Sequence, residues 1–381
     1  MRSQASAVSE GAWRSRFGYR RQVEALRAHG LAGEGSKLAI GPRNGNGQAW
    51  AWAQALRHHA GLPVEVFTAE YSSGRLAMTH RTDVSIPLKD WKRREWQIWW
   101  AHRLQTQFSH VLIEQGLTAC GWLNGKGFFD DLPAMLNSGM KVGLVFRGSE
   151  IRDPAGHAAR ERWSPFQDPN DPLTAELQSR FARVRREVDR CDVPKVVTTM
   201  DLLDDVPGAI WLPHVLDTQT WQPGPPILQR SRPVVLHAPS RTGQMKGSQW
   251  VDEACQPLHD AGVIEYRRLR GVPYAEMPSR IRAADIVIDQ LALGSHGVLA
   301  LQAMASERLV IGHVSGRVRS RLSDQIPVVE AEPPDVRGVL EDTLAARDHS
   351  RHLAASGREY VLRYHAGEES ADRLQANLVV P

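Results

Sequence analysis

The sequence lacks the features that mark several protein classes. None of its uninterrupted apolar runs approaches the roughly 20 residues that a membrane-spanning helix needs, so a transmembrane protein is not expected. Only three cysteines are present, without CxxC spacing, which argues against a disulfide framework and a zinc site. The formal net charge of +4 is too small to indicate nucleic-acid binding by itself. The N-terminal end carries charge without an apolar core, so we expect no signal peptide and a cytoplasmic, reducing setting.

Sequence motifs for common cofactors are also missing. Neither GxGxxG nor the GK[ST] of a P-loop occurs, and the 15 histidines show no HExxH spacing. We therefore expect no catalytic metal ion and no bound cofactor.

What is present is a recurrent pattern of short β-rich runs separated by stretches of helical periodicity, as in parallel βα units. The runs form two series. Between them lies a stretch with four prolines and no helical period, and a helix-forming segment follows the second series. The fold class expected is α/β, with an N-terminal extension at 1–35, a Rossmann-like domain at 36–215, a linker at 216–232, a second Rossmann-like domain at 233–350 and C-terminal helices at 351–381.

A glycine-rich turn follows the first β-rich run, KLAI. Gly45, Asn46 and Gly47 occupy this strand-to-helix connection, where a missing Cβ lets backbone amides approach a phosphate or a sugar. A tight structural turn without a ligand explains the same glycines. The turn alone is therefore only a candidate for ligand contact.

The second series opens with VVLHAPSRTGQMKG, which sets Arg241 and Lys246 five residues apart in a loop after a strand. Fixed cations at this position can stabilise the charge that develops on a departing diphosphate. In open α/β sheets, ligands bind at the carboxyl ends of the strands, which is where this loop belongs. The alternative is that both side chains only solvate a surface loop.

A third segment, ADIVIDQLALGSHGVLALQAMA, reads as a buried strand, a turn and an apolar helix that begins near Val298. The start of a helix offers free amides to an anion. Together with the preceding loop, this segment resembles the nucleotide-sugar site of GT-B glycosyltransferases, especially glycosyltransferase family 4 (group 1 glycosyl transferases). In that family a Glu, seven residues and a second Glu lie in a stretch that ends GxxxxEAMA.

The resemblance extends over most of the chain, in blocks that occur in the family's order. Besides the two loops above, FRGSEIRDP resembles an FHGSDIR-type turn in the acceptor domain, DLLDDVPGAIWLPHVLD resembles the stretch that leads into the linker, and YVLRYHAGEESADRL resembles the closing helix. The resemblance implies two Rossmann-like domains facing each other across a cleft, with the last helices crossing back to the first domain.

The resemblance also implies a function, namely transfer of a sugar from a nucleoside-diphosphate sugar to an acceptor hydroxyl, with retention of configuration and without a metal ion. Arg241 and Lys246 would hold the diphosphate, and Gln302 would lie near the ribose. The donor site would further include Ser295, His296, Gly297 and Val298, and the acceptor side would include Gly45, Asn46, Gly47, Arg147 and Glu150.

Two departures from the family pattern bear on this function. The first Glu of the pair is replaced by Gly294 and the second by Gln302, and an amide offers one acceptor oxygen where a carboxylate offers two. Asp289 or His296 lies close enough in the sequence to take over part of the first glutamate's role. Two other functions stay open: a GT-B protein that binds a partner without turnover, and an epimerase that acts on a nucleotide sugar without an acceptor.

The stretch from Asp90 to Phe108 places Trp96, Trp99, Trp100 and Leu104 near one helical stripe with basic residues around it. Such a stripe is typical of a core helix, and the alternative is an interfacial helix that contacts a membrane or an acceptor. The acceptor itself stays open between a glycan, a lipid-linked sugar, a small metabolite, a protein and a modified nucleic acid. Peripheral membrane contact and the oligomeric state stay open as well.

Overall fold

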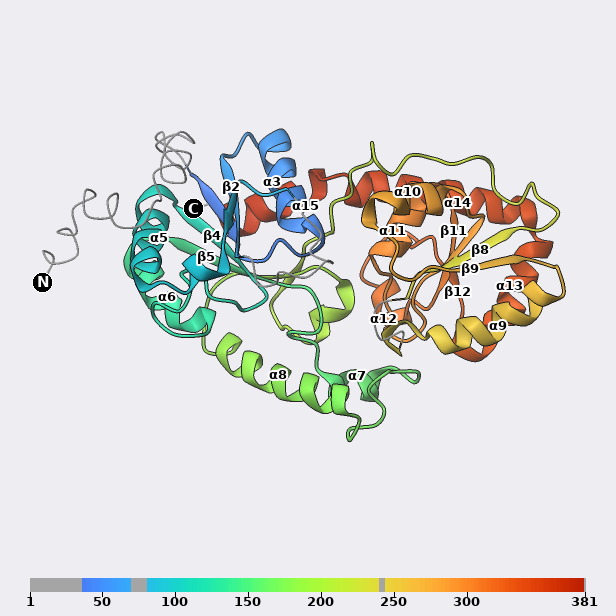
Figure 1. Ribbon diagram of the computed structural model, residues 1–381, viewed down its shortest axis with the longest axis horizontal. Coiled ribbons are helices and arrows are strands. Elements are labelled where there is room, and N and C mark those ends of the chain that lie inside the picture. Colours follow the sequence, from blue (N-terminus) through green and yellow to red (C-terminus); the bar gives the residue numbers. More distant parts are fainter. Residues whose placement is uncertain (1–35, 70–80, 240–243, 380–381) are drawn as a thin grey trace, which may run out of the picture.

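The computed structural model describes residues 36–69, 81–239 and 244–379. Two α/β domains lie side by side, and the helices at the C-terminal end of the chain extend across both (Figure 1). The N-terminal extension expected at 1–35 lies outside the described residues. So does Arg241.

The first domain is built on a seven-stranded, fully parallel sheet in the order β3-β2-β1-β4-β5-β6-β7. Its strands are β1 (Leu38–Gly41), β2 (Val64–Ala69), β3 (Val84–Ile86), β4 (His110–Glu114), β5 (Lys141–Phe146), β6 (Lys195–Val197) and β7 (Ile210–Trp211). Its helices are η1 (Gly45–Gly47), α3 (Gln48–His59), α4 (Leu88–Trp91), α5 (Arg94–Gln107), α6 (Phe128–Asn137), α7 (Pro154–Arg160), α8 (Pro172–Val188) and η2 (Met200–Asp204). The strand order reverses between β1 and β4, the position at which open α/β sheets bind ligands.

The second domain has a five-stranded parallel sheet in the order β12-β11-β10-β8-β9. Its strands are β8 (Val234–His237), β9 (Glu265–Arg268), β10 (Ile286–Ile288), β11 (Leu309–Gly312) and β12 (Val329–Glu330). The helices from here to the end are η3 (Gln244–Lys246), α9 (Ser248–Asp260), η4 (Tyr274–Glu276), α10 (Met277–Arg282), α11 (Val298–Ala305), α12 (Gly316–Arg319), η5 (Pro333–Asp335), α13 (Val336–Ala345), α14 (Arg347–His365), α15 (Glu368–Leu374) and η6 (Gln375–Val379). The inner strands β8, β10 and β11 are short and fully buried because both faces of the sheet are covered there, whereas the edge strands β9 and β12 are polar and partly exposed.

The tryptophan-rich helix α5 belongs to the core of the first domain. Trp96, Trp100 and Leu104 are buried there, and the Trp100 Nε1–H donates to the carbonyl of Ala119 at 3.0 Å. The basic residue Arg103 is buried as well, in a bidentate pair with Glu65 on β2. The core interpretation of this stripe is therefore confirmed, and the same side chains are not free to contact a membrane.

The last helices connect the two domains. α14 packs against α11 and β11 of the second domain, whereas α15 packs against α3 of the first (Figure 1). The Ser370 hydroxyl donates to the carbonyl of Pro213 at 2.9 Å, and the main-chain amide of Leu216 donates to the carbonyl of His365 at 2.8 Å. The chain thus crosses back at the point where the first domain ends.

The proline-containing connection between the domains is anchored on the second sheet. The buried carboxylate of Asp285 accepts from the amides of Leu228 and Val234, both at 2.7 Å. Arg308 donates to the carbonyl of Pro225 at the same distance. Side chains of the second domain therefore satisfy backbone groups that no strand or helix pairs.

Candidate functional site

The glycine-rich turn after β1 is held by a residue that the sequence did not single out. Glu114, the last residue of β4, is fully buried and accepts from the amides of Arg43 at 2.9 Å and Asn44 at 2.7 Å. Asn44, Asn46 and Gly47 all have positive φ, so the turn uses the left-handed region three times within four residues. The signal in the sequence was a carboxylate that ends the apolar run HVLI at the carboxyl edge of a parallel sheet.

Arg147 joins the same cluster from the end of β5. Its guanidinium donates to the carboxylate of Glu114 and to the carbonyl of Gly45, and it lies 5.1 Å from the ring centre of Trp52. Glu150 caps the following turn by accepting from the amide of Arg147. The structure therefore brings together Gly45, Arg147 and Glu150, three of the residues predicted for the acceptor side, and the guanidinium is used inside the protein.

In the second domain, Lys246 is paired with a buried carboxylate. Its ammonium lies 2.7 Å from Oδ1 of Asp289, and Oδ2 of Asp289 accepts from the amide of Gly297 at the same distance. Burial raises the pKa of Asp289, but the charge and hydrogen bond of Lys246 and the Gly297 amide outweigh it and hold the pKa below its ordinary value. Asp289 is therefore an ionised link between the lysine and the residue that precedes α11.

The exposure of Lys246 is intermediate, with 16% of its side chain accessible. An ammonium has three hydrogens, and the bond to Asp289 uses one of them. The side chain thus lies at the carboxyl edge of the second sheet rather than in bulk water, and the described residues leave donors of its ammonium for a further acceptor.

The loop that precedes α11 is well packed. The carbonyl of Ser295 accepts from the side chain of Gln290, and Val298 is the first residue of the helix. His296 is buried against the rings of Tyr360 and His365, and its Nδ1 finds no hydrogen-bond partner among the described residues. Burial lowers the pKa of His296 to about 4, so the imidazole is neutral at pH 7.

Gln302, one turn into α11, is buried and hydrogen-bonds the side chain of Tyr274. Tyr274 begins η4 after β9, is 41% exposed, and its ring lies 6.1 Å from that of Trp221. An exposed aromatic ring next to the predicted ribose contact was not anticipated. Its signal was a tyrosine in the glycine- and proline-containing connection after β9.

Loops at the carboxyl edges of the two sheets contact each other. The Arg321 guanidinium, after α12, donates to the carbonyl of Met200 and to Asp204, the latter at 2.6 Å. His157 on α7 lies 3.4 Å from the carbonyl of Leu293 through Nε2. The predicted donor residues and the predicted acceptor residues therefore belong to facing edges of the two sheets.

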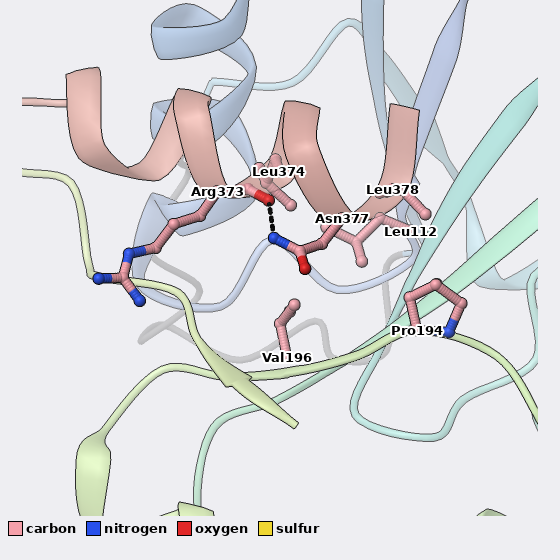
Figure 2. Close-up of a pocket in the computed structure, with 8 residues that line it drawn as sticks. Leu112, Pro194, Val196, Arg373, Leu374, Asn377 and Leu378 are labelled. Atoms are coloured by element: carbon pink, nitrogen blue, oxygen red, sulfur yellow. Dashed lines mark hydrogen bonds between the residues drawn. The ribbon is translucent and has the colours of Figure 1, made fainter. Parts of the chain in front are cut away.

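A small apolar crevice lies elsewhere, between the C-terminal helices and the first sheet (Figure 2). It is lined by side chains that include those of Leu112, Val196, Leu374 and Leu378, and Asn377 closes one side by donating to the carbonyl of Arg373 at 2.8 Å. None of the predicted site residues lines it. The crevice is a packing feature of the returning helix.

Within residues 36–69, 81–239 and 244–379, no three His, Cys, Asp or Glu side chains are grouped so that they could hold a metal ion. In the same residues no helix combines the length and the apolar character needed to span a bilayer.

Comparison with known proteins rests on structure alone, since no protein-family model and no curated protein matches the sequence. The sucrose-phosphate synthase of Thermosynechococcus elongatus is 14% identical with a TM-score of 0.60, covering 90% of this chain and 98% of that one. An alpha-glucosyltransferase in complex with UDP and a 13-mer DNA containing an HMU base is 10% identical with a TM-score of 0.61, covering 91% and 100%. Anabaena HepE in complex with UDP and glucose is 11% identical with a TM-score of 0.55, covering 90% and 99%.

This chain aligns with nearly the whole length of each of these proteins, across both domains. The chain has the GT-B fold. The α/β class and the two facing Rossmann-like domains expected from the sequence are confirmed. At 10–14% identity the likeness reaches the GT-B fold and no further.

Proposed function

We propose that this GT-B protein is a group 1-like glycosyltransferase that moves a sugar from a nucleoside-diphosphate sugar to an acceptor hydroxyl. The observation that carries the proposal is the Lys246–Asp289–Gly297 link. It holds a cation beside the start of α11, where helix amides without an internal partner attract an anion.

The donor diphosphate would bind between Lys246 and the first turn of α11. Charge that builds on the departing phosphate would then meet a fixed ammonium, which stabilises it without reorganisation. Arg241 stays a prediction as the second cation. Gln302 would lie near the ribose, with the exposed ring of Tyr274 beside it.

The acceptor would approach from the first domain, past the turn that contains Gly45, Asn46 and Gly47. The Glu114–Arg147 pair fixes the backbone of this turn from inside the domain. In this proposal the backbone of the turn faces the acceptor, whereas the guanidinium of Arg147 does not contact it. Retention of configuration, with the leaving phosphate assisting removal of the acceptor's proton, requires no metal ion and no cofactor in this proposal.

Several features support the proposal. Structures of the GT-B neighbours contain UDP, UDP with glucose, or UDP-glucose. The motif blocks of the sequence agree in order with those of nucleotide-sugar enzymes. The acceptor stays open between a glycan, a lipid-linked sugar, a small metabolite, a protein and a modified nucleic acid.

The test is the release of UDP or GDP from a panel of nucleotide sugars, with and without candidate acceptors. Acceptor-dependent release from one donor class, with a glycosylated product detected by mass spectrometry, is expected. A folded protein that neither binds nor hydrolyses any donor would contradict the proposal.

A second function, donor binding without turnover, is favoured by one observation. Gly294 and Gln302 replace both carboxylates of the family pattern, and the amide of Gln302 is engaged with Tyr274. Tight binding of a nucleotide sugar without product from any acceptor would favour this function. An isomerised sugar formed from donor alone would instead indicate an epimerase.

A further inference from the structure

A segment of the first domain covers the carboxyl edge of the second sheet. Trp163, in the stretch after α7, packs edge-on against Trp250 of α9 with ring centres 6.0 Å apart. Its Nε1–H donates to Glu332, which follows β12, at 3.1 Å. Contacts of Trp163 therefore reach from α9, the helix after β8, to the stretch after β12.

The carboxylate of Glu161 lies in this segment, directly over Gly294. A Cβ added to Gly294 would stand 2.8 Å from the carboxyl carbon and from Oε1 of Glu161. Gly294 also has a φ of +64°, which a residue with a side chain rarely adopts. The space in which a side chain at position 294 would begin is thus occupied by a carboxylate from the other domain.

Glu161 is held there by hydrogen bonds with the side chains of His313 and Ser315. Its Oε2 lies 3.3 Å from Nε2 of His313, which follows β11 and is bonded through Nδ1 to Glu330 at 2.5 Å. Burial opposes a charge on the imidazole, yet the bonds to Glu161 and Glu330 raise the pKa of His313 to about 9. Burial raises the pKa of Glu161, but the bond and charge of His313 outweigh it, and the pKa lies below its ordinary value.

An ionised carboxylate has about four acceptor positions, so the contacts with His313 and Ser315 leave others for a ligand. Gly294 lies in the same loop as Gly297, which is linked through Asp289 to Lys246. A diphosphate bound at the start of α11 would leave its sugar next to the preceding part of this loop. Hydroxyl groups bond strongly to carboxylates in such partly enclosed sites.

Building on the proposed function, we propose that Glu161 binds a hydroxyl of the donor sugar, so that the first domain supplies a carboxylate at the position where the second domain has only Gly294. The donor site is then complete only when the two domains are together. Glu161 is a sugar-specificity residue, and a nucleoside diphosphate without a sugar does not use it.

The test compares ligands with and without the sugar. Affinities of UDP and UDP-glucose, and of GDP and GDP-mannose, are measured by calorimetry for the wild type and for Glu161→Gln. For the pair that binds the wild type, the variant is expected to weaken the nucleotide sugar about tenfold while the nucleoside diphosphate changes less than about twofold, which corresponds to about 1.4 kcal/mol of sugar contact.

The matched control is Glu332→Gln, which makes the same charge change in the same domain contact but away from Gly294. It is expected to leave the ratio of the two affinities unchanged. Equal weakening of both ligands by Glu161→Gln, as for a residue that only holds the domains together, would overturn the proposal, and so would unchanged affinities for both ligands. A wild type that binds none of the four ligands would overturn the proposed function as well, a result distinguishable from the other two.

Discussion

The two predicted halves of the site use their charges differently. In the first domain, Arg147 and Glu114 are buried, face each other and bind the backbone of the glycine-rich turn. In the second, Lys246 is partly exposed, and among the residues that the structure describes its ammonium is bonded to Asp289 with donors to spare. A cation whose bonds are made inside the protein positions other groups, whereas a cation with free donors is suited to bind a ligand.

Glu114→Ala provides the sharpest test of the first half and has the largest expected effect. It leaves Arg147 without its buried counterion and the amides of Arg43 and Asn44 without their acceptor, so a loss of about 3–5 kcal/mol in the free energy of unfolding is expected. Urea unfolding followed by tryptophan fluorescence measures it. Glu176→Ala, which breaks an exposed pair with Arg180, is the control and is expected to cost less than about 1 kcal/mol.

Lys246→Ala tests the second half. If the ammonium binds the leaving diphosphate, transfer falls at least about tenfold, because a charge-assisted contact of about 1.5–3 kcal/mol is lost. Steady-state kinetics with the best donor of the panel measures it, and Arg241→Ala is expected to behave alike. Lys141→Ala, at an exposed position at the start of β5, is the control. Equal kinetics for Lys246→Ala and this control would remove Lys246 from the site.

Gly294→Ala probes the contact between the halves. The alanine at position 294 must adopt a positive φ, and its methyl group meets the Glu161 carboxylate. The alanine of Gly262→Ala must also adopt a positive φ, of +74°, but its methyl group meets open space. Both variants carry backbone strain of about 1–2 kcal/mol. The additional destabilisation of Gly294→Ala, expected at about 1 kcal/mol or more, isolates the clash with Glu161. Equal losses of unfolding free energy in the two variants, measured by thermal or urea unfolding, would show that the Glu161 side chain moves aside without destabilising the protein.

Gln302→Glu has the smallest expected effect. A carboxylate accepts from both ribose hydroxyls where the amide has one acceptor, so donor binding is expected to tighten by about tenfold at most, since the bond to Tyr274 is rearranged. Calorimetry with the nucleoside diphosphate measures it. An unchanged dissociation constant would place the ribose elsewhere.

The sequence predicted part of the site and missed part of it. Lys246, Gly297 and Gln302 follow β8 or β10 closely, and in a parallel sheet residues after neighbouring strands meet at one edge. Glu114 was missed because one carboxylate at the end of an apolar run has the same appearance whether it is solvated or buried. The signal of Tyr274, one tyrosine in a glycine- and proline-containing connection, does not show what the ring contacts, and Glu161 carries no local signal because it belongs to no repeated pattern.

The order of apolar runs and turn residues in the sequence was enough to determine two parallel-sheet domains, since periodicity and turn chemistry are local properties of the chain. It also indicated which loops lie at the ligand-binding edge, because strand direction follows from connectivity. Only the tertiary structure decided that Arg147 is used internally and that Glu161 lies over Gly294. Such contacts join side chains far apart in the chain, and they depend on how two whole domains pack.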